Sequence, residues 1–226
     1  MDAVIVDIEG VIRDSKNAFH HAYEYALASV DKKLKLDSYP AETWKLRGFK
    51  EFNTQREVLK AIYAIAKAKE DLTRILWKKY PVEYLKELIK QKPISKENLE
   101  TMERAYIYYL THPRIIRRIP PVRAGKIGVK LLREDGYRVG ALTNSSSEYN
   151  SKWISYKKMD GHFDVVLSID DVGAPKPNPD GILKACAKLK AKPKKTIYIG
   201  DTEADIIAAK NAGCIPVAIL SGGTER

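Results

Sequence analysis

The sequence has few cysteines and no long apolar run. Its only two cysteines, Cys186 and Cys214, have neither the spacing of a metal-binding motif nor that of a redox motif. We expect both to be reduced core residues of a cytoplasmic protein. No apolar run approaches the ~20 residues that a membrane-spanning helix needs. The chain opens directly on an apolar strand pattern, without the pattern of a signal peptide. These absences predict a soluble cytoplasmic protein without a membrane partner.

Glutamine is also scarce, whereas lysine, isoleucine and tyrosine are abundant, a composition that predicts a thermophilic source. The formal net charge is +11, and residues 15–119 carry 22 Lys and Arg against 13 Asp and Glu. Such an excess can bind nucleic acid or attract a small anionic substrate. The basic residues are spread along amphipathic helix patterns, without a compact block or an aromatic RNA-binding signature. We therefore expect solvated helix faces and no nucleic-acid partner.

Two kinds of pattern divide the chain. Apolar segments rich in β-branched residues predict strands at 3–8, 137–142, 164–168, 196–199 and 215–220, with helical patterns between them. Strands that alternate with helices predict an α/β fold with a doubly wound, parallel, five-stranded sheet of the Rossmann type. Residues 15–119 have helical spacing throughout. We therefore expect an all-helical domain at 15–119, inserted into an α/β core formed by 1–14 and 120–226.

Apolar spacing also predicts individual helices. One apolar stripe runs over 56–79 and suggests a single long helix. A helix that carries Ile127, Leu131 and Leu132 is expected to end near Gly136, a plausible helix C-cap. A helix over 180–189 is expected to turn Ile182, Leu183, Cys186 and Leu189 inward.

Four acidic residues fall where two predicted strands end. Asp7 and Glu9 close the first strand, where side chains two positions apart share a face. Asp201 and Asp205 follow the strand at 196–199. Ligands of parallel sheets bind outside the carboxyl ends of the strands, and a group of carboxylates there suits Mg²⁺. Each acid also has a simpler explanation, as a solvated strand end or as a complement to a helix dipole.

Four motifs in order indicate a family. They are Asp7-x-Glu9-Gly10, Leu142-Thr143-Asn144, Lys176 within Ala-Pro-Lys-Pro-Asn-Pro, and Gly200-Asp201-x-x-x-Asp205. Taken singly, Thr143 could be an ordinary strand-end hydroxyl and Lys176 an ordinary loop lysine. Together the motifs resemble the haloacid dehalogenase-like hydrolase superfamily, most of whose members are phosphatases. The helical insertion directly after the first motif resembles the helical-cap subclass of that superfamily.

This resemblance implies a role for each motif residue. Asp7 would be the nucleophile, Glu9 the general acid and base, and Lys176 the partner of Asp7 and of the phosphate. The resemblance further implies two binding sets: Thr143, Asn144 and Gly10 for the phosphoryl group, and Asp7, the Glu9 carbonyl, Asp201 and Asp205 for Mg²⁺, with Asp205 as a ligand or as its support. A carboxylate nucleophile reaches a phosphate only if cations compensate the charge, so the roles are chemically consistent.

Glu9 departs from the family pattern, which has Asp at this position. The segment Asp-Ile-Glu-Gly is similar to the first motif of enolase-phosphatases, whereas the loops that carry Thr143 and Lys176 are more similar to the phosphoglycolate-phosphatase-like branch. Glu is one methylene longer than Asp, which leaves its reach as an acid and base plausible. The dehalogenase branch usually has no acid here, which argues against dehalogenation.

The sequence therefore predicts a Mg²⁺-dependent phosphatase that acts on a small phosphorylated metabolite through an aspartyl-phosphate. A phosphomutase or a 2-haloacid dehalogenase of the same fold, or a catalytically impaired module that binds an anion, are the alternatives. Substrate specificity is expected to come from the helical domain. Its best candidate is the segment 47–56, with Arg47, Lys50 and Arg56, which could equally be an ordinary polar connection between helices.

Overall fold

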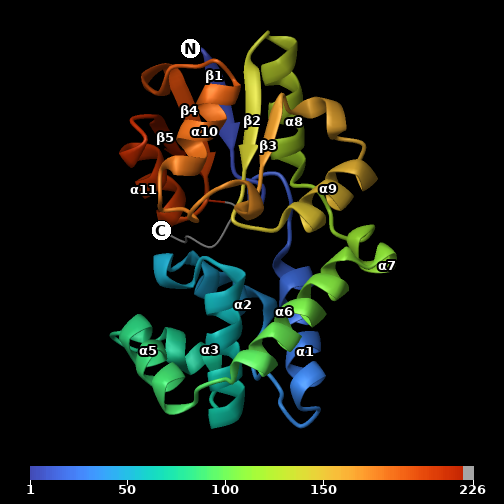
Figure 1. Ribbon diagram of the computed structural model, residues 1–226, viewed down its shortest axis with the longest axis vertical. Helices are drawn as coiled ribbons and strands as arrows, with labels where there is room; N and C mark the ends of the chain where they lie inside the picture. The colour runs from blue at the N-terminus through green and yellow to red at the C-terminus, as the bar shows by residue number, and fades with distance from the viewer. Residues whose placement is uncertain (221–226) are drawn as a thin grey trace. The chain divides into compact units, whose positions relative to one another are not determined.

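The structure is a computed structural model that describes residues 1–220 (Figure 1). Its internal contacts divide the chain into two compact units. Met1–Ser15 and Ile116–Arg226 belong to the first, which we call the sheet unit, and Lys16–Ile115 form the second, the helical unit. The helical unit is thus one continuous segment inserted into the sheet unit soon after its first strand.

The sheet unit is built on five parallel strands, as predicted. They are β1 (Ala3–Val6), β2 (Arg138–Leu142), β3 (Val165–Leu167), β4 (Thr196–Gly200) and β5 (Ile215–Ala218). Their order is β3-β2-β1-β4-β5, so β1 is central and pairs with both β2 and β4 (Figure 1). The first strand ends earlier than predicted, at Val6, because the chain turns back on itself after Asp7. The carboxyl ends of β1, β2 and β4 therefore lie side by side.

Helices follow the strands in the doubly wound pattern. Those of the sheet unit are α8 (Arg123–Glu134), α9 (Ser147–Tyr156), α10 (Asp180–Lys188) and α11 (Glu203–Asn211), with 3₁₀ turns η2 (Asp160–His162), η3 (Ile169–Asp171) and η4 (Pro193–Lys195). The short α7 (Pro113–Ile116) comes just before α8 in the chain. Helices α10 and α11 bury their apolar residues in one core cluster together with Ile5 and Tyr198 of the sheet. Cys186 and Cys214 belong to that cluster, and both are buried free thiols.

Large apolar residues are exposed on two helices, and one of them, Leu183, was predicted to face inward. On α8, Ile127 is 48% exposed and Leu131 is 53% exposed, whereas Val129 is buried. Helix α8 comes very close to the backbone of Val11 at Gly125. A Cβ on Gly125 would lie 1.9 Å from the Val11 carbonyl oxygen, so only glycine fits there. On α10, Leu183 is exposed although Ile182, Cys186 and Leu189 are buried as predicted. A pattern of large apolar residues does not reveal a close approach made by a glycine such as Gly125.

The helical unit consists of helices and the short segments that join them. They are α1 (Lys16–Val30), α2 (Pro40–Gly48), η1 (Lys50–Phe52), α3 (Gln55–Ala68), α4 (Leu72–Leu76), α5 (Pro81–Gln91) and α6 (Lys96–Thr111). The single helix predicted over 56–79 is wrong, because Lys69 adopts a left-handed conformation with φ 57° and ends α3. Helices α1 and α6 pack together through Tyr23 and Tyr106, whose ring centroids lie 5.1 Å apart. Among the described residues, no helix has the length and apolarity to cross a membrane.

Two isoleucines on helices provide a test of this packing. Ile62 on α3 is fully buried, whereas Ile127 on α8 is half exposed. We expect Ile62→Ala to lower the free energy of unfolding by about 2–5 kcal/mol, because it leaves a cavity. Ile127→Ala is the matched control and should cost less than about 1 kcal/mol. Denaturant unfolding of both variants measures this, and equal costs would contradict the described burial.

Candidate active site

The carboxyl ends of the three adjacent strands bring the motif residues together. Asp7 follows β1, Thr143 follows β2 and Asp201 follows β4. The backbone keeps them in register, since the Asp7 amide donates to the Ile199 carbonyl and the Thr143 amide to the Leu167 carbonyl. All three side chains are buried. The parallel sheet thus gathers, at one edge, polar residues from positions 7, 143 and 201 of the chain.

Lys176 occupies the middle of this group. Its ammonium nitrogen Nζ donates to Asp7 Oδ1 at 2.8 Å, to Asp205 Oδ1 at 2.6 Å and to the Tyr198 hydroxyl at 3.0 Å. Because Lys176 is only 5% exposed, its charge depends on these partners. The loop that carries it is fixed by the Asn144 side chain, which accepts from the Lys176 amide and donates to the Lys176 carbonyl. The Asn144 side chain therefore positions the lysine.

Burial and charge shift the pKa values of this group. Burial raises the pKa of the Asp7 carboxyl well above its ordinary 3.8. The positive charge of Lys176 opposes this rise. The nearby carboxylates add to it, and Asp205 adds the most among them. Burial alone lowers the pKa of Lys176, but Asp205 and Asp7 outweigh burial and hold that pKa well above 10.5. Lys176 is therefore charged at neutral pH. The buried carboxylates around it outnumber this single cation.

Asp205 is the N3 residue of a capping box at the start of α11. Its Oδ2 accepts from the amide and the hydroxyl of Thr202, while its Oδ1 accepts from Lys176 and Tyr198. Both oxygens are thus occupied by protein donors. Of the two roles predicted for Asp205, ligand or support, this geometry favours support.

Asp201 lies against the backbone of the first motif. Gly10 has φ +72°, and a Cβ on it would lie 2.3 Å from Asp201 Oδ2. Glycine is therefore required here both for the left-handed backbone and for the close approach of the carboxylate. Gly10 was predicted as a phosphate contact, and the structure gives it this second, structural reason.

Glu9 points toward the end of β2. Its Oε2 accepts from the Thr143 hydroxyl at 2.6 Å, and its Oε1 accepts from the Ser145 hydroxyl at 2.6 Å and from the guanidinium of Arg13. Glu9 and Asp7 do not share a strand face as predicted, because the strand ends at Val6 and the Arg13 amide turns back to the Ile8 carbonyl. The longer Glu side chain thus has a dedicated cationic partner.

The sequence reading missed Arg13, which is fully buried. Its guanidinium carbon stands 3.8 Å from the centroid of the Tyr149 ring and 5.2 Å from that of Trp153, and its Nη2 donates to Asn150 Oδ1 at 2.7 Å. Aromatic faces attract a guanidinium, so α9 holds the arginine in place. The sequence feature that could have indicated this pair is the position of Arg13, four residues after the oppositely charged Glu9. Tyr198 and Ser145 were missed because their strand and loop positions look ordinary.

The buried acids fit a divalent cation. Carboxylate oxygens of Asp7, Asp201 and Asp205 lie within 4.8 Å of one another, and all three residues are buried. Oxygen ligands and unbalanced buried negative charge are what Mg²⁺ requires. The Glu9 carboxylate is turned to Arg13 and Thr143, so only its backbone carbonyl could join such a site.

Two of the three predicted specificity residues have separate partners in the helical unit. Arg47 donates to the Tyr23 hydroxyl at 2.8 Å and stacks on Phe19, and Arg56 pairs with Glu103 at 3.3 Å. Lys50 is exposed on η1. Their role in substrate choice stays a prediction.

Comparison with known proteins establishes the family. A model of haloacid dehalogenase-like hydrolases matches residues 1–213, and the chain belongs to this family. Curated relatives include the pyrophosphatase PpaX of Bacillus mycoides (strain KBAB4), 38% identical over 91 residues, and that of Bacillus cereus (strain ATCC 10987 / NRS 248), 37% identical over 91 residues. Each match covers 40% of this chain and 42% of the relative, so the chain matches less than half the length of these proteins.

Solved structures share the fold. A predicted phosphoglycolate phosphatase from Haemophilus somnus 129PT has a TM-score of 0.75 at 19% identity, covering 98% of this chain and 86% of its own. A β-phosphoglucomutase from Clostridium difficile has a TM-score of 0.67 at 18% identity, covering 96% of this chain and 84% of its own. The family resemblance and the α/β fold predicted from the motifs are confirmed.

The buried acids predict a stability response to Mg²⁺. We expect saturating Mg²⁺ to raise the melting temperature of the protein, because the cation relieves repulsion among Asp7, Asp201 and Asp205. At a concentration of 100 Kd the stabilisation is about 2.7 kcal/mol. Asp201→Asn should abolish this shift, and the exposed control Asp135→Asn should keep it. Thermal melts with Mg²⁺ and with EDTA measure it; an unchanged response in Asp201→Asn would rule out the site.

Proposed function

We propose that this chain is a Mg²⁺-dependent phosphatase that hydrolyses a small phosphorylated metabolite through an aspartyl-phosphate on Asp7. One observation carries the proposal: a buried lysine, Lys176, joins the predicted nucleophile to Asp205 beside Asp201. This arrangement holds a carboxylate at the edge of the sheet where ligands of parallel sheets bind. It also supplies a fixed positive charge where phosphoryl oxygens need compensation.

In the first step, Asp7 attacks the phosphorus atom. A bond forms from a carboxylate oxygen to phosphorus, while the bond from phosphorus to the leaving oxygen breaks and its electron pair departs with that oxygen. Lys176 would compensate the charge of the phosphoryl oxygens during the transfer, and the Thr143 hydroxyl, which donates to Glu9 in this structure, would turn to donate to one of them. To deliver a proton to a leaving alkoxide, the Glu9 carboxyl would turn away from its contact with Arg13.

In the second step, water attacks the aspartyl-phosphate. Glu9 would accept a proton from that water, the bond between Asp7 and phosphorus breaks, and inorganic phosphate leaves. The residues fit for Mg²⁺ are Asp7, Asp201 and the Glu9 carbonyl, with Asp205 as support. When bound, the cation would supply positive charge that offsets the charges of the phosphate and the nucleophile.

Names of similar proteins guide the choice of substrates. The curated relatives are named pyrophosphatases, and one solved neighbour is titled a predicted phosphoglycolate phosphatase. Pyrophosphate and phosphoglycolate are therefore the first substrates to test. The basic excess of residues 15–119 would favour the approach of such anions. We further propose a cytoplasmic location, since Cys186 and Cys214 are buried free thiols.

A phosphomutase of the same fold is the second candidate, because one solved neighbour is titled a β-phosphoglucomutase. The two activities differ in the acceptor of the phosphoryl group. A phosphatase releases inorganic phosphate in proportion to the substrate consumed, whereas a mutase returns the phosphoryl group to an organic hydroxyl. Phosphate release from a panel of sugar phosphates, acids and pyrophosphate therefore separates them.

The nucleophile can be tested directly. Asp7→Asn should abolish Mg²⁺-dependent release of phosphate while the far-ultraviolet circular dichroism spectrum stays that of wild type, because the amide cannot form the phosphoryl bond. Wild type should also become labelled on Asp7 during turnover, as detected by mass spectrometry of rapidly quenched samples. Near-normal hydrolysis by Asp7→Asn would exclude the covalent mechanism.

Glu9 provides a second test, based on leaving groups. We expect Glu9→Gln to slow turnover by about 10²–10⁴, the usual contribution of an acid–base group. Alkyl phosphates should suffer more than nitrophenyl phosphate, because an alkoxide needs the proton and a nitrophenolate does not. The exposed residue Glu148 on α9 supplies the control, Glu148→Gln, which should behave as wild type. Equal loss on both substrates would contradict the acid role.

A further inference from the structure

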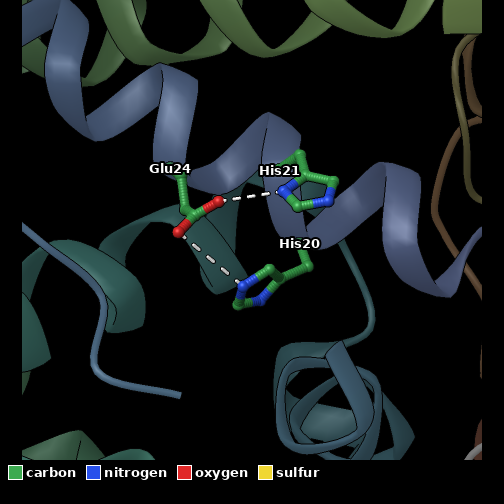
Figure 2. Close-up of side chains that lie close together, drawn as sticks. All are labelled: His20, His21 and Glu24. Atoms are coloured by element: carbon green, nitrogen blue, oxygen red, sulfur yellow. Dashed lines mark hydrogen bonds and ion pairs between the residues drawn. The ribbon is translucent and has the colours of Figure 1, made fainter. Parts of the chain in front are cut away.

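Three side chains of the helical unit have the composition of a metal site. His20, His21 and Glu24 project from α1, and their possible ligand atoms lie within 4.8 Å of one another. Figure 2 shows the Glu24 carboxylate reaching toward both imidazole rings. Because Glu24 follows His20 by four residues and His21 by three, one helical turn places its carboxylate next to both rings.

The Glu24 carboxylate directs one oxygen to each ring. Its Oε2 lies 3.0 Å from His21 Nδ1, and its Oε1 lies 3.8 Å from His20 Nε2 (Figure 2). The His20 side chain is only 6% exposed, whereas those of His21 and Glu24 are 55% and 45% exposed. One ligand is thus anchored in the helical core, and the other two can be reached by an ion from solution.

Thr43 on α2 fixes which nitrogen of His20 faces Glu24. The Thr43 hydroxyl donates its single proton to the Pro40 carbonyl at 3.0 Å, so it can only accept from His20 Nδ1, 3.4 Å away. The hydrogen of the neutral ring then sits on Nδ1, and Nε2 carries the lone pair. Histidines that bind metals typically use their other N–H in this way, to fix the tautomer and the ring orientation.

The gap between His20 and Glu24 is therefore shaped for a cation. In the neutral ring, the Nε2 lone pair faces a carboxylate oxygen 3.8 Å away. Two acceptors at that distance make no hydrogen bond to each other. A positive ion between them would satisfy both atoms at once.

We propose that His20, His21 and Glu24 bind a divalent transition-metal ion of the Zn²⁺ type. Two imidazole nitrogens and one carboxylate oxygen are a typical zinc ligand set, whereas Mg²⁺ prefers oxygen ligands. Ligands at about 2.0–2.2 Å from zinc lie roughly 3.3 Å apart, so small rotations of the exposed His21 and Glu24 complete the site. Water fills the remaining positions. This site differs in place and in ligand chemistry from the Asp7, Asp201 and Asp205 cluster.

The experiment uses the full chain without a polyhistidine tag, in buffer that contains millimolar Mg²⁺ to occupy the carboxylate cluster. Titration with ZnCl₂ by calorimetry should show one zinc ion bound per chain. Co²⁺ added instead should give visible absorption bands with a nitrogen-ligand signature. Neither readout depends on enzyme activity, so failure of the proposed phosphatase function would leave this test unaffected.

Variants then locate the ion. His21→Ala and Glu24→Gln change exposed side chains and should fold normally, which circular dichroism checks; each should lower zinc affinity at least ~10-fold. Thr43→Val keeps the shape of a buried residue and should weaken binding by about 10–100-fold, the usual contribution of an outer-sphere partner. The matched controls are His162→Gln in the sheet unit and the exposed Glu87→Gln on α5, and both should bind as wild type does.

Two results would overturn the proposal. One is the absence of zinc binding by wild type under these conditions. The other is zinc binding that is unchanged in His21→Ala and Glu24→Gln, or that disappears only in Asp201→Asn, because the ion would then occupy the carboxylate cluster.

Discussion

The contact of Lys176 with Asp7 and Asp205 is the interaction on which the sheet unit's polar edge depends. Three carboxylates cannot stay buried at adjacent strand ends without a counter-charge. Lys176 supplies one positive charge and distributes it over Asp7, Asp205 and the Tyr198 hydroxyl. Removing one partner of such a buried pair typically costs about 3–5 kcal/mol. The surrounding structure holds this contact in place: the Asn144 side chain bonds to the backbone of Lys176, and the capping box of α11 fixes Asp205.

A second buried ion pair, between Arg13 and Glu9, organises the other side of the same edge. The arginine is enclosed by Tyr149, Trp153 and Asn150, so its fixed charge requires the Glu9 carboxylate. The Thr143 and Ser145 hydroxyls complete the shell around that carboxylate. An Asp at this position would be one methylene shorter and could not make the same contacts without a shift of the backbone. The Glu therefore belongs to a set of residues that have adapted to its length.

Different kinds of interaction stabilise the interior of each unit. The sheet unit relies on backbone pairing of parallel strands and on charge compensation at one edge. The helical unit relies on aromatic packing, with Phe19 and Tyr23 of α1 against Tyr106 of α6, and on capped helix ends such as Thr54 and Ser95. Its polar contacts lie both within one helix, as between Glu24 and His21, and between helices, as between Arg56 and Glu103.

The sequence by itself determined the α/β class, the parallel strands and the identity of Asp7, Thr143, Lys176 and Asp201 as polar residues at strand or loop ends. Apolar strands and their terminal acids are local signals, readable from composition and period. Only the tertiary structure decided which partner each side chain takes. Arg13 pairs with Glu9 because the chain reverses after Asp7, and Asp205 faces Lys176 because β4 lies beside β1. The exposed residues of α8 and α10 were also decided there, and so was the end of α3 at the left-handed Lys69. Local patterns record which residues prefer burial, but three-dimensional packing sets the neighbours that satisfy buried charge.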